Sequence, residues 1–504
     1  MDFQLLGDYI NGQFSSPKDP IGEFTRKSPA DFEDTIGSFR YSFNSVDKAV
    51  EAARKAFKSW QLTTIEERKN LLKKFKTQLK RRRPLLEKII CREVGKPAWE
   101  AKGEVDAMIS KFDITLTAGM KVIAPFEVPN GYKKTAGRCR YKPRGVLAVL
   151  GPFNFPASLP HDHIVAALLT GNCVVFKPSE YTPATGQVYT EIAHQAGFPR
   201  GVINLVQGGA RVGSHLAKHT DIDGILFTGS YETGIKIQKE TLNDYWKILA
   251  LEMGGKNSAI ILADADIDKA LIECLNGAFL TTGQRCSSTS RLIIDRKISN
   301  QFIERFHDLA KKVVIDHPHA DQQGRKTPFM GPLISARAKE KYLKFQDIAT
   351  REKAERIMRA KPLERDPEGH YVAPSIYLVK KPDLESIYQQ TEIFGPNVAI
   401  YLVDGAEEAI EIANKTSFGL VLSAFTQSEK IFEKIFTLSR TGLVNWNLST
   451  VCSSQRLPFG GVKKSGNARP AGLFSTQYCT YPVAELRDSE PFDSQNLPPG
   501  VIWG

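Results

Sequence analysis

Between residues 145 and 250, short apolar runs alternate with stretches that carry apolar residues at helical spacing. The apolar runs are VLAVLG, NCVVFK, GVINLVQ and DGILFT. Runs of this length, each followed by a helical pattern, are typical of βαβ units with parallel strands. The pattern therefore predicts a parallel sheet flanked by helices in this part of the chain.

Two further regions extend this prediction. Residues 46–119 have a mainly helical pattern, clearest in VDKAVEAARKAFKSW and ERKNLLKKFKTQLK, and we expect these helices to cover the sheet. From residue 257 to about 440 a second alternation has strand candidates in NSAIILADADIDKA, SRLIIDR, SIYLV, NVAIYLV and LVLSAFT. The charge-rich residues 351–370 are predicted to form a solvated loop and helix. We expect an α/β protein with two α/β domains.

The composition agrees with a large globular protein. The chain has 504 residues, of which 41% are hydrophobic and 25% charged, so it is long enough for two or three domains. The first residues, MDFQLLGDYINGQF, lack the basic and apolar regions of a signal peptide. The most apolar stretch, GVLAVLGPFNFPASLP, is interrupted by prolines and is too short to cross a bilayer. Neither secretion nor a membrane span is expected.

The cysteines and the net charge limit the cellular compartments and the binding partners that are expected. The seven cysteines are scattered without CxxC spacing, which argues against disulfides and zinc and favours the reducing cytoplasm. The net charge is +12, and cations cluster between residues 73 and 83. Because Leu71, Leu72, Phe75 and Leu79 recur there at helical spacing, the cations are predicted to form a solvated helix face. Nucleic acid is not an expected partner, although salt-dependent binding stays open as a side activity.

Two turns after predicted strands have residues that suit a phosphate or a ribose. In DGILFTGSYETGIKIQKE, an apolar run meets Gly229, Ser230 and Gly234 and then becomes helical. Glycines allow close approach of a ligand and a helix N-terminus offers N–H groups to phosphate, although this spacing also fits an ordinary turn. Lys177 and Glu180 follow NCVVFK, where open α/β sheets bind ligands, and they also fit an ordinary surface pair.

One cysteine and one glutamate have surroundings that suit catalysis. Cys286 lies among Gly, Ser and Thr in TTGQRCSSTSRL, and the adjacent Arg285 could lower the pKa of its thiol. The other six cysteines are interpreted as small buried side chains. Glu252, in LALEMGGKN, stands where a predicted strand leaves the core, and partial burial would raise its pKa towards neutrality, as a general base requires. Ion pairing is the alternative for Glu252.

Together these segments resemble the aldehyde dehydrogenase superfamily over nearly the whole chain. The shared motifs are GPFNFP (151–156), KPSEYTP (177–183), FTGS with Gly234, LEMGG (251–255), GQRC (283–286), EIFGP (392–396) and PFGG followed by KSG (458–466). Within the superfamily, WEAKGEVDAMISK, ILALEMGGKN and PFGGVKKSGNARPA are similar to members that act on carboxylated semialdehydes of arginine catabolism.

The resemblance implies a Rossmann-like cofactor domain, a catalytic α/β domain and a small β arm for oligomerisation. We assign residues 1–119 and 145–251 to the NAD-binding domain and residues 252–440 to the catalytic domain. Residues 120–144 and 467–490 are assigned to the arm. A homo-oligomer is expected by analogy alone.

The resemblance also implies a mechanism and a cofactor. Cys286 would attack the aldehyde to form a thiohemiacetal, the side-chain amide of Asn154 and the backbone N–H of Cys286 would stabilise the oxyanion, and Glu252 would activate water. The implied cofactor is NAD, and no metal would be required. The residues implied to hold NAD are Lys177 and Glu180 at the adenosine ribose, the turn Gly229, Ser230, Tyr231, Glu232, Thr233 and Gly234 at the pyrophosphate, and Glu392 and Phe394 at the nicotinamide riboside.

The substrate is expected to be an aldehyde on a long anionic acyl-amino-acid chain, with N-succinylglutamate 5-semialdehyde as the first candidate. Hydroxyls and a cation in the tunnel would suit carboxylates, because charge-assisted hydrogen bonds are strong. The implied tunnel residues are Phe155, Ser158, Leu159, Ser453 and Arg456, while Asp162 fits poorly and Arg456 equally fits a solvent-facing position. The alternatives are another carboxylated semialdehyde, a coenzyme A-acylating enzyme, which generally lacks the base, and a non-catalytic binding protein.

Overall fold

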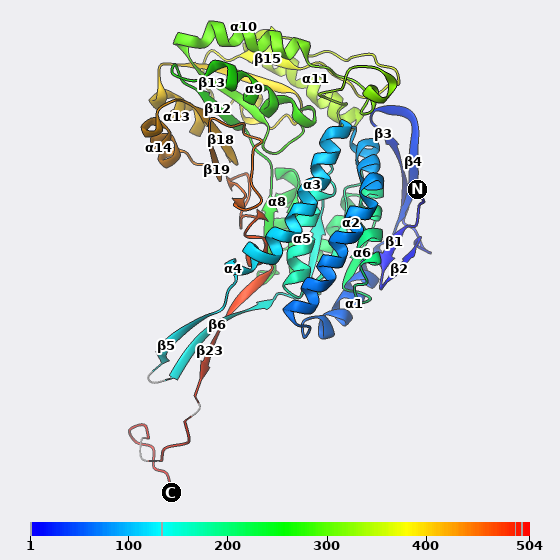
Figure 1. Cartoon of the computed structure of the whole chain (residues 1–504), viewed down its shortest axis with the longest axis vertical. Helices are drawn as coiled ribbons and strands as arrows, with labels where there is room; N and C mark the ends of the chain where they lie inside the picture. Colours follow the sequence, from blue (N-terminus) through cyan, green and yellow to red (C-terminus); the bar gives the residue numbers. More distant parts are fainter. Residues whose placement is uncertain (1–2, 133–134, 489, 495–496) are drawn as a thin grey trace.

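The computed structural model describes residues 3–132, 135–488, 490–494 and 497–504, and its two largest sheets each have seven strands (Figure 1). The first sheet has the order β11-β10-β7-β8-β9-β1-β2. Its parallel strands are β7 (Val146–Leu150), β8 (Cys173–Lys177), β9 (Ile203–Leu205), β10 (Gly224–Thr228) and β11 (Ile248–Glu252). Strands β1 (Asp8–Ile10) and β2 (Gln13–Ser15) extend one edge in antiparallel pairing. The parallel sheet predicted between residues 145 and 250 is confirmed.

The order of these strands creates a ligand-binding position. From β7 the chain continues to β8 on one side and later returns to β10 on the other side of β7. The carboxyl ends of β7, β8 and β10 therefore surround a topological switch point, where open α/β sheets bind ligands.

Two groups of helices pack on this sheet. Helices α5 and α6 contact the strands directly and carry α2 and α3 on their outer side, whereas α1 contacts the strands together with α7. The bounds are α1 (Phe43–Trp60), α2 (Ile65–Val94), α3 (Ala98–Ile114), α5 (Ser158–Leu169), α6 (Pro183–Gln195), α7 (Ala210–Lys218) and α8 (Tyr231–Glu240). The helical prediction for residues 46–119 is confirmed.

The basic run lies on α2, with Leu72, Phe75 and Leu79 buried beneath it. Several of its cations are exposed, namely Lys73, Lys74, Lys80 and Arg81. Others pair with carboxylates of neighbouring helices: Lys76 with Asp113, Arg82 with Glu191, and Arg83 with Asp106. The face is therefore solvated in part and ion-paired in part.

The second sheet has the order β14-β15-β16-β13-β12-β18-β19 and is parallel except for β14. Its strands are β12 (Asn257–Ile261), β13 (Thr289–Asp295), β14 (Glu355–Met358), β15 (Ser375–Leu378), β16 (Asn397–Val403), β18 (Val421–Phe425) and β19 (Leu443–Trp446). Its helices are α9 (Ile267–Phe279), α10 (Arg296–Lys312), α11 (Ala336–Arg351), α13 (Ala406–Asn414) and α14 (Glu429–Leu438). The second predicted α/β region is confirmed.

One expectation for this region was wrong in part. Residues 351–370 were expected to be a loop and a helix, but Glu355–Met358 form β14, which pairs antiparallel with β15. The strand lies at the edge of the sheet, and Glu355 and Arg356 on it are exposed. Charged edge strands discourage pairing between molecules, so the same charge that suggested a loop is compatible with a strand.

A separate three-stranded antiparallel sheet projects from the body beside the C-terminal segment (Figure 1). It has the order β23-β6-β5, with β5 (Phe126–Tyr132), β6 (Thr135–Pro143) and β23 (Thr480–Arg487). These strands lie within the segments assigned to the arm, of which residues 133, 134 and 489 are outside the described residues. A hairpin of β3 (Gly22–Ser28) and β4 (Asp31–Tyr41) lies on the other side of the body. Among the described residues, no helix is both long and apolar enough to span a membrane.

Candidate active site

Glu252 ends β11 beneath a glycine turn, and both of its carboxylate oxygens are buried without a hydrogen-bond partner among the described residues. Residues 465–467 run across the end of β11 and bond to the residues on either side of Glu252. The Met253 N–H donates to the Ser465 carbonyl at 3.0 Å, and the Leu251 N–H donates to Asn467 Oδ1 at 2.9 Å. The carboxylate is therefore fixed by its backbone, with its oxygens left available for chemistry.

The turn after Glu252 brings a second carboxylate close. Gly254 has a φ of +82°, and a Cβ there would lie 2.4 Å from a carboxylate oxygen of Glu392, so glycine is required. The Gly255 N–H donates to Glu392 Oε1 at 2.9 Å. The motif LEMGG thus allows Glu252 and Glu392 to share one buried site.

Burial changes the acidity of both carboxyl groups. It raises the pKa of Glu252 to about 7, and the neighbouring Cys286 thiol and Gly254 N–H offset the increase only in part. It raises the pKa of Glu392 to about 8, against the Gly255 N–H, which lowers it, and with a further increase from the charge of Glu252. A carboxylate that titrates near neutral pH has the acidity of a general base.

Cys286 follows a strained turn. Thr281, Thr282 and Gly283 have φ values of 53°, 57° and 68°, which place two β-branched residues in the left-handed region. Each such residue costs about 1–3 kcal/mol and persists only when its surroundings hold it. On the other side of the loop, Asn257 Nδ2 donates to the Cys286 carbonyl at 2.7 Å.

Cys286 as a whole residue is half-buried. Burial raises its pKa well above the ordinary value, and the carboxylates of Glu252 and Glu392 raise it further. The expectation that Arg285 lowers this pKa was wrong, because its guanidinium pairs with Glu100 at 2.5 Å. The thiol consequently depends on a base such as Glu252 to remove its proton.

Asn154 lies in the loop between β7 and α5 and is buried. Its Nδ2 donates to the Gln284 carbonyl at 2.9 Å, two residues before Cys286. The amide carries a second N–H, so this bond holds the group beside the nucleophile loop without using all of its donors. The structure thus brings together the neighbourhoods of the three predicted catalytic residues.

The residues expected to contact the cofactor lie around the switch point. Lys177 ends β8, and its buried Nζ donates to the carbonyls of Pro178 at 2.6 Å and Gly208 at 2.8 Å. Burial lowers the pKa of Lys177, and the charge of Glu180, which is half-buried, opposes this. Both residues are therefore at the carboxyl end of β8.

The turn between β10 and α8 has an open surface on one side and tight packing on the other. Ser230 is the N-cap of α8 and accepts from the Thr233 N–H, and Ser230, Glu232 and Thr233 are exposed, while Tyr231 is half-buried. A Cβ at Gly234 would lie 2.2 Å from Met253 Sδ, so the helix packs closely on the chain beyond β11. This turn is suited to an anionic ligand at a helix N-terminus.

Phe394 and Glu392 lie on the loop before β16. The Phe394 ring, at a φ of 58°, packs edge-on against Phe153 with ring centroids 5.7 Å apart. Lys341 Nζ donates to the Glu392 carbonyl at 3.1 Å. This loop therefore lies against the GPFNFP loop as well as against the LEMGG turn.

The residues expected to line the substrate tunnel fall in two loops. Phe155, Ser158 and Leu159, at and just before the start of α5, are half-buried, whereas Ser453 and Arg456 are exposed. Asp162, which fitted the tunnel poorly, is buried beside Lys111 at 3.6 Å. Thr450 Oγ1 lies 2.7 Å from Thr289 Oγ1, so this second loop is near the nucleophile loop. Burial raises the pKa of Cys452, next to Ser453, and the charge of Arg285 opposes the increase only in part.

Several residues around the site had no role assigned from sequence. Asn257 holds the Cys286 carbonyl, and Lys96, Glu100 and Glu104 contact the loops on either side of the site. The spacing of Glu100 and Glu104 by four residues within WEAKGEVD was the available signal, because such residues share one helix face. Within the described residues, no group of three or more metal-ligating side chains was found.

Comparison with known proteins gives one consistent result. The model of the aldehyde dehydrogenase family matches residues 17–482. N-succinylglutamate 5-semialdehyde dehydrogenase of Serratia proteamaculans is 38% identical over 503 residues, covering 98% of this chain and 99% of the relative. The enzyme with the same name from Acinetobacter baylyi is 39% identical over 464 residues, covering 91% of each chain.

Solved structures have the same fold. An NAD-dependent aldehyde dehydrogenase from Sinorhizobium meliloti is 28% identical, with a TM-score of 0.91 over 97% of this chain and 95% of that one. A point mutant of betaine aldehyde dehydrogenase from Staphylococcus aureus, in complex with NAD+, is 28% identical, with a TM-score of 0.91 over 98% of this chain and 99% of that one. The chain belongs to the aldehyde dehydrogenase family.

Proposed function

We propose that the chain is an NAD-dependent dehydrogenase that oxidises N-succinylglutamate 5-semialdehyde to N-succinylglutamate. The reaction type rests on one observation, the convergence of the thiol of half-buried Cys286, a buried carboxylate with a pKa of about 7 and an amide donor on adjoining loops. Members of the family to which the chain belongs carry the corresponding name.

Cys286 is the nucleophile of the proposed reaction. An aldehyde has no leaving group, so hydride departs only after a nucleophile has made the carbonyl carbon tetrahedral. Glu252 takes the thiol proton, and the sulfur then attacks the carbonyl to form a thiohemiacetal. Asn154 supports the oxyanion with its amide N–H, and the loss of one such donor typically costs about 3 kcal/mol.

The residues around the switch point fit NAD. A Cβ at Gly229 would lie 2.5 Å from the Phe227 ring, so the turn packs tightly and leaves the helix N-terminus free of a side chain at this position. Lys177 and Glu180 would hold the adenosine ribose, the turn from Gly229 to Gly234 the pyrophosphate, and Glu392 and Phe394 the nicotinamide riboside. Bound NAD would supply the acceptor for the hydride that leaves the tetrahedral carbon.

Once the thiol proton has passed from Glu252 to solvent, the ionised carboxylate is also the base of the second half of the reaction. The acyl group that remains on Cys286 is a thioester, and Glu252 removes a proton from the water that hydrolyses it. An acceptor thiol such as coenzyme A would not require this base. The buried, unpartnered oxygens of Glu252 therefore favour hydrolysis over acyl transfer.

The substrate assignment combines the relatives' names with the two loops beside the thiol. Ser158, Phe155 and Leu159 on one loop and Ser453 and Arg456 on the other supply hydroxyls, one cation and apolar surface to a long carboxylated chain. Charge-assisted hydrogen bonds from Arg456 to a substrate carboxylate are worth about 1.5–3 kcal/mol.

Two properties of the whole protein belong to this proposal. The arm of β5, β6 and β23 joins subunits in a homo-oligomer, and the exposed apolar side chains Phe126 and Leu486 on it support this role. The protein works in a reducing compartment such as the cytoplasm, in keeping with seven free cysteines.

The proposed function is tested with purified protein and a panel of aldehydes. NADH formation is measured with N-succinylglutamate 5-semialdehyde, succinate semialdehyde, glutamate semialdehyde and a neutral aldehyde of similar length, with and without coenzyme A. We expect the highest kcat/KM for the first substrate and no requirement for coenzyme A. A higher kcat/KM for the neutral aldehyde overturns the substrate assignment, and turnover by Cys286→Ala overturns the mechanism.

A further inference from the structure

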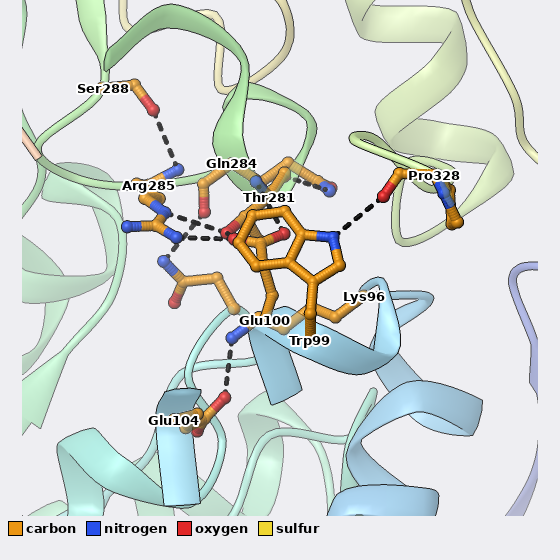
Figure 2. Close-up of polar contacts among 10 residues, drawn as sticks. Lys96, Trp99, Glu100, Glu104, Thr281, Gln284, Arg285, Ser288 and Pro328 are labelled. Atoms are coloured by element: carbon orange, nitrogen blue, oxygen red, sulfur yellow. Dashed lines mark hydrogen bonds and ion pairs between the residues drawn. The ribbon is translucent and has the colours of Figure 1, made fainter. Parts of the chain in front are cut away.

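Helix α3 contacts both the loop that carries the proposed nucleophile and the segment that follows the oxyanion donor. Figure 2 shows Glu100 beside Thr281 and Arg285 of the first loop, and Glu104 beside Lys96. Glu100 faces the nucleophile loop. Its Oε2 accepts from the Thr281 N–H at 3.1 Å, and its Oε1 accepts from Thr281 Oγ1 at 2.8 Å and from Arg285 at 2.5 Å. One carboxylate therefore binds the start of the strained turn and the residue that precedes Cys286.

Glu104, one helical turn further along α3, faces the other loop. Its Oε1 accepts from the N–H groups of Ala157 and Ser158, both at 3.1 Å, where the GPFNFP loop enters α5. Its Oε2 accepts from Lys96 Nζ at 2.6 Å. Glu104 therefore holds the segment that follows Asn154.

The ring of Phe155 connects the two halves of this cluster. Lys96 Nζ lies 3.5 Å from the ring centroid, and the Arg285 guanidinium carbon lies 5.0 Å from it. Both distances are within the range of cation–π interaction. Arg285 directly precedes Cys286, and Phe155 directly follows Asn154. The contact between Arg285 and Phe155 therefore links the two loops.

The cluster is buried and balanced in charge. The side chains of Lys96, Glu100 and Glu104 are at most 2% exposed and that of Arg285 is 16% exposed, and two cations oppose two carboxylates. Buried ionic groups are costly unless each is paired and hydrogen-bonded, and here all four are. The bonds from Thr281 to Glu100 also help to hold the left-handed backbone at the start of this turn.

We propose that Glu100 and Glu104 are positioning residues that set the distance between the Cys286 thiol and the Asn154 amide, by fixing one loop each from a single rigid helix. The proposal rests on the roles assigned to Cys286 and Asn154 under the proposed function. The two carboxylates position different reacting groups. Glu100 acts on the nucleophile, and Glu104 acts on the oxyanion donor.

Two measured rates distinguish the role of Glu100 from that of Glu104. The first is alkylation of Cys286 by iodoacetamide, followed by peptide mass spectrometry, which depends on the thiol and its loop but not on Asn154. The second is the first-turnover formation of NADH from N-succinylglutamate 5-semialdehyde, which depends on both loops. Both are measured below the melting temperature of each variant, and NAD affinity is measured by fluorescence titration.

Glu100→Gln is expected to slow both rates, because the thiol moves from its place beside Glu252. Misplacement of reacting groups by about 1 Å costs up to about 100-fold, so at least tenfold is expected. Glu104→Gln is expected to slow NADH formation by a similar factor and to leave alkylation within about twofold, because the thiol loop keeps its own anchor. Neither variant is expected to change NAD affinity.

Asp106→Asn is the matched control, because Asp106 lies on the same helix and pairs at 2.7 Å with Arg83 of α2, away from both loops. It is expected to leave both rates unchanged. Arg285→Lys, which retains the charge but loses the forked donor, is the second variant if Glu100→Gln does not fold, and both rates should fall as for Glu100→Gln.

Two results overturn the proposal. In one, the glutamine variants melt earlier but retain both rates, which indicates a purely stabilising cluster. In the other, Glu104→Gln slows alkylation as much as Glu100→Gln does, which indicates one loosened core instead of two separate anchors. If alkylation of Cys286 in the unsubstituted enzyme leaves turnover intact, the proposed function itself fails, whatever the variants do.

Discussion

At the scale of single residues, Cys286, the proposed nucleophile, lies beside two buried carboxylates, and among the described residues no cation lowers the pKa of its thiol. Burial and negative charge both raise the pKa of Cys286, so its proton must be transferred as the aldehyde reacts. Glu252, with a pKa raised to about 7, is half-ionised at neutral pH and can accept that proton. The pH dependence of the reaction should follow this carboxyl group.

We expect steady-state kcat to rise with pH through about 7, because only ionised Glu252 accepts a proton from thiol or water. In Glu252→Gln this limb should disappear, and steady-state turnover should fall by about 100-fold or more, the usual contribution of a general base. First-turnover NADH formation should fall less than steady-state turnover, since deacylation needs the base most. Stopped-flow absorbance at several pH values measures both, and normal multiple turnovers would exclude the role.

The same carboxyl group affects stability. The pKa of Glu252 is about 7 in the folded protein, whereas the ordinary value, which applies to the unfolded chain, is 4.5. Folding therefore favours the protonated form. The resulting stabilisation is complete below about pH 4.5 and is lost as the pH rises through 7. Glu252→Gln should therefore increase the unfolding free energy at pH 8, by about 1–3 kcal/mol. Urea denaturation at pH 5 and pH 8 measures it, and an equal difference from the unsubstituted enzyme at both values would contradict the burial argument.

Glu180 should determine the choice of cofactor. A carboxylate at the adenosine ribose repels a 2′-phosphate, by about 1–4 kcal/mol for charges about 4 Å apart. We expect a higher kcat/KM for NAD than for NADP, and a selective gain with NADP in Glu180→Gln. Glu191→Gln, on the following helix and paired with Arg82, is the control. Equal efficiency of the two cofactors in the unsubstituted enzyme would refute this role.

The sequence was sufficient to predict some of the site residues and their roles, but not others. Cys286 and Glu252 could be selected because each stands in surroundings with a chemical reason, whereas Asn154 was implied by the family resemblance alone; the structure brings their loops together. The role given to Arg285 was wrong because adjacency in sequence does not determine side-chain direction. Its partner Glu100 lies 185 positions away, a contact that only the tertiary structure brings about.

At the scale of elements, α3 is a buried-charge helix, and its N-terminal end should be sensitive to charge removal. Lys96→Met leaves Glu104 buried with one cation fewer, and the loss of one member of a buried pair costs about 3–5 kcal/mol. Lys102→Met, at an exposed position of α3, is the control and should change stability little. Guanidinium denaturation compares the two variants, and equal midpoints would argue against the buried pair.

The elements were predicted best where they are buried. Strands β7, β8 and β10 are buried throughout and mainly apolar, and they could be located from the alternation of runs. Strand β14 could not, because Glu355 and Arg356 lack the apolar pattern of an interior strand and its pairing with β15 depends on chain folding. An edge strand has one strand neighbour and is otherwise exposed to solvent, so its sequence can be as polar as that of a loop. The pattern of apolar and polar residues alone therefore does not distinguish the two.

At the scale of the whole molecule, the arm should control assembly. Strand β5 pairs with β6 on one side, and the residues described along it are exposed, including Phe126 and Val128. Among the described residues β5 has a strand neighbour on one side only, and exposed apolar side chains on such an edge strand favour association with another chain. We expect an oligomer in solution, and Phe126→Asp together with Val128→Asp should reduce its mass in light scattering, whereas Leu62→Asp, exposed on the body, should not. A monomeric unsubstituted protein would contradict the prediction.

The crossing of β11 by residues 465–467 has a consequence for how the protein is made. Ribosomes deliver residue 252 long before residue 465, roughly 10–40 s earlier at about 5–20 residues per second. The strands of the first sheet can pair during that interval, whereas the backbone partners of Leu251 and Met253 arrive only with Ser465 and Asn467. The first sheet can therefore form while Glu252, the proposed base, still lacks these backbone contacts on either side of it. We therefore expect the proposed base to become competent only after residues 465–467 have been made and have bonded to β11.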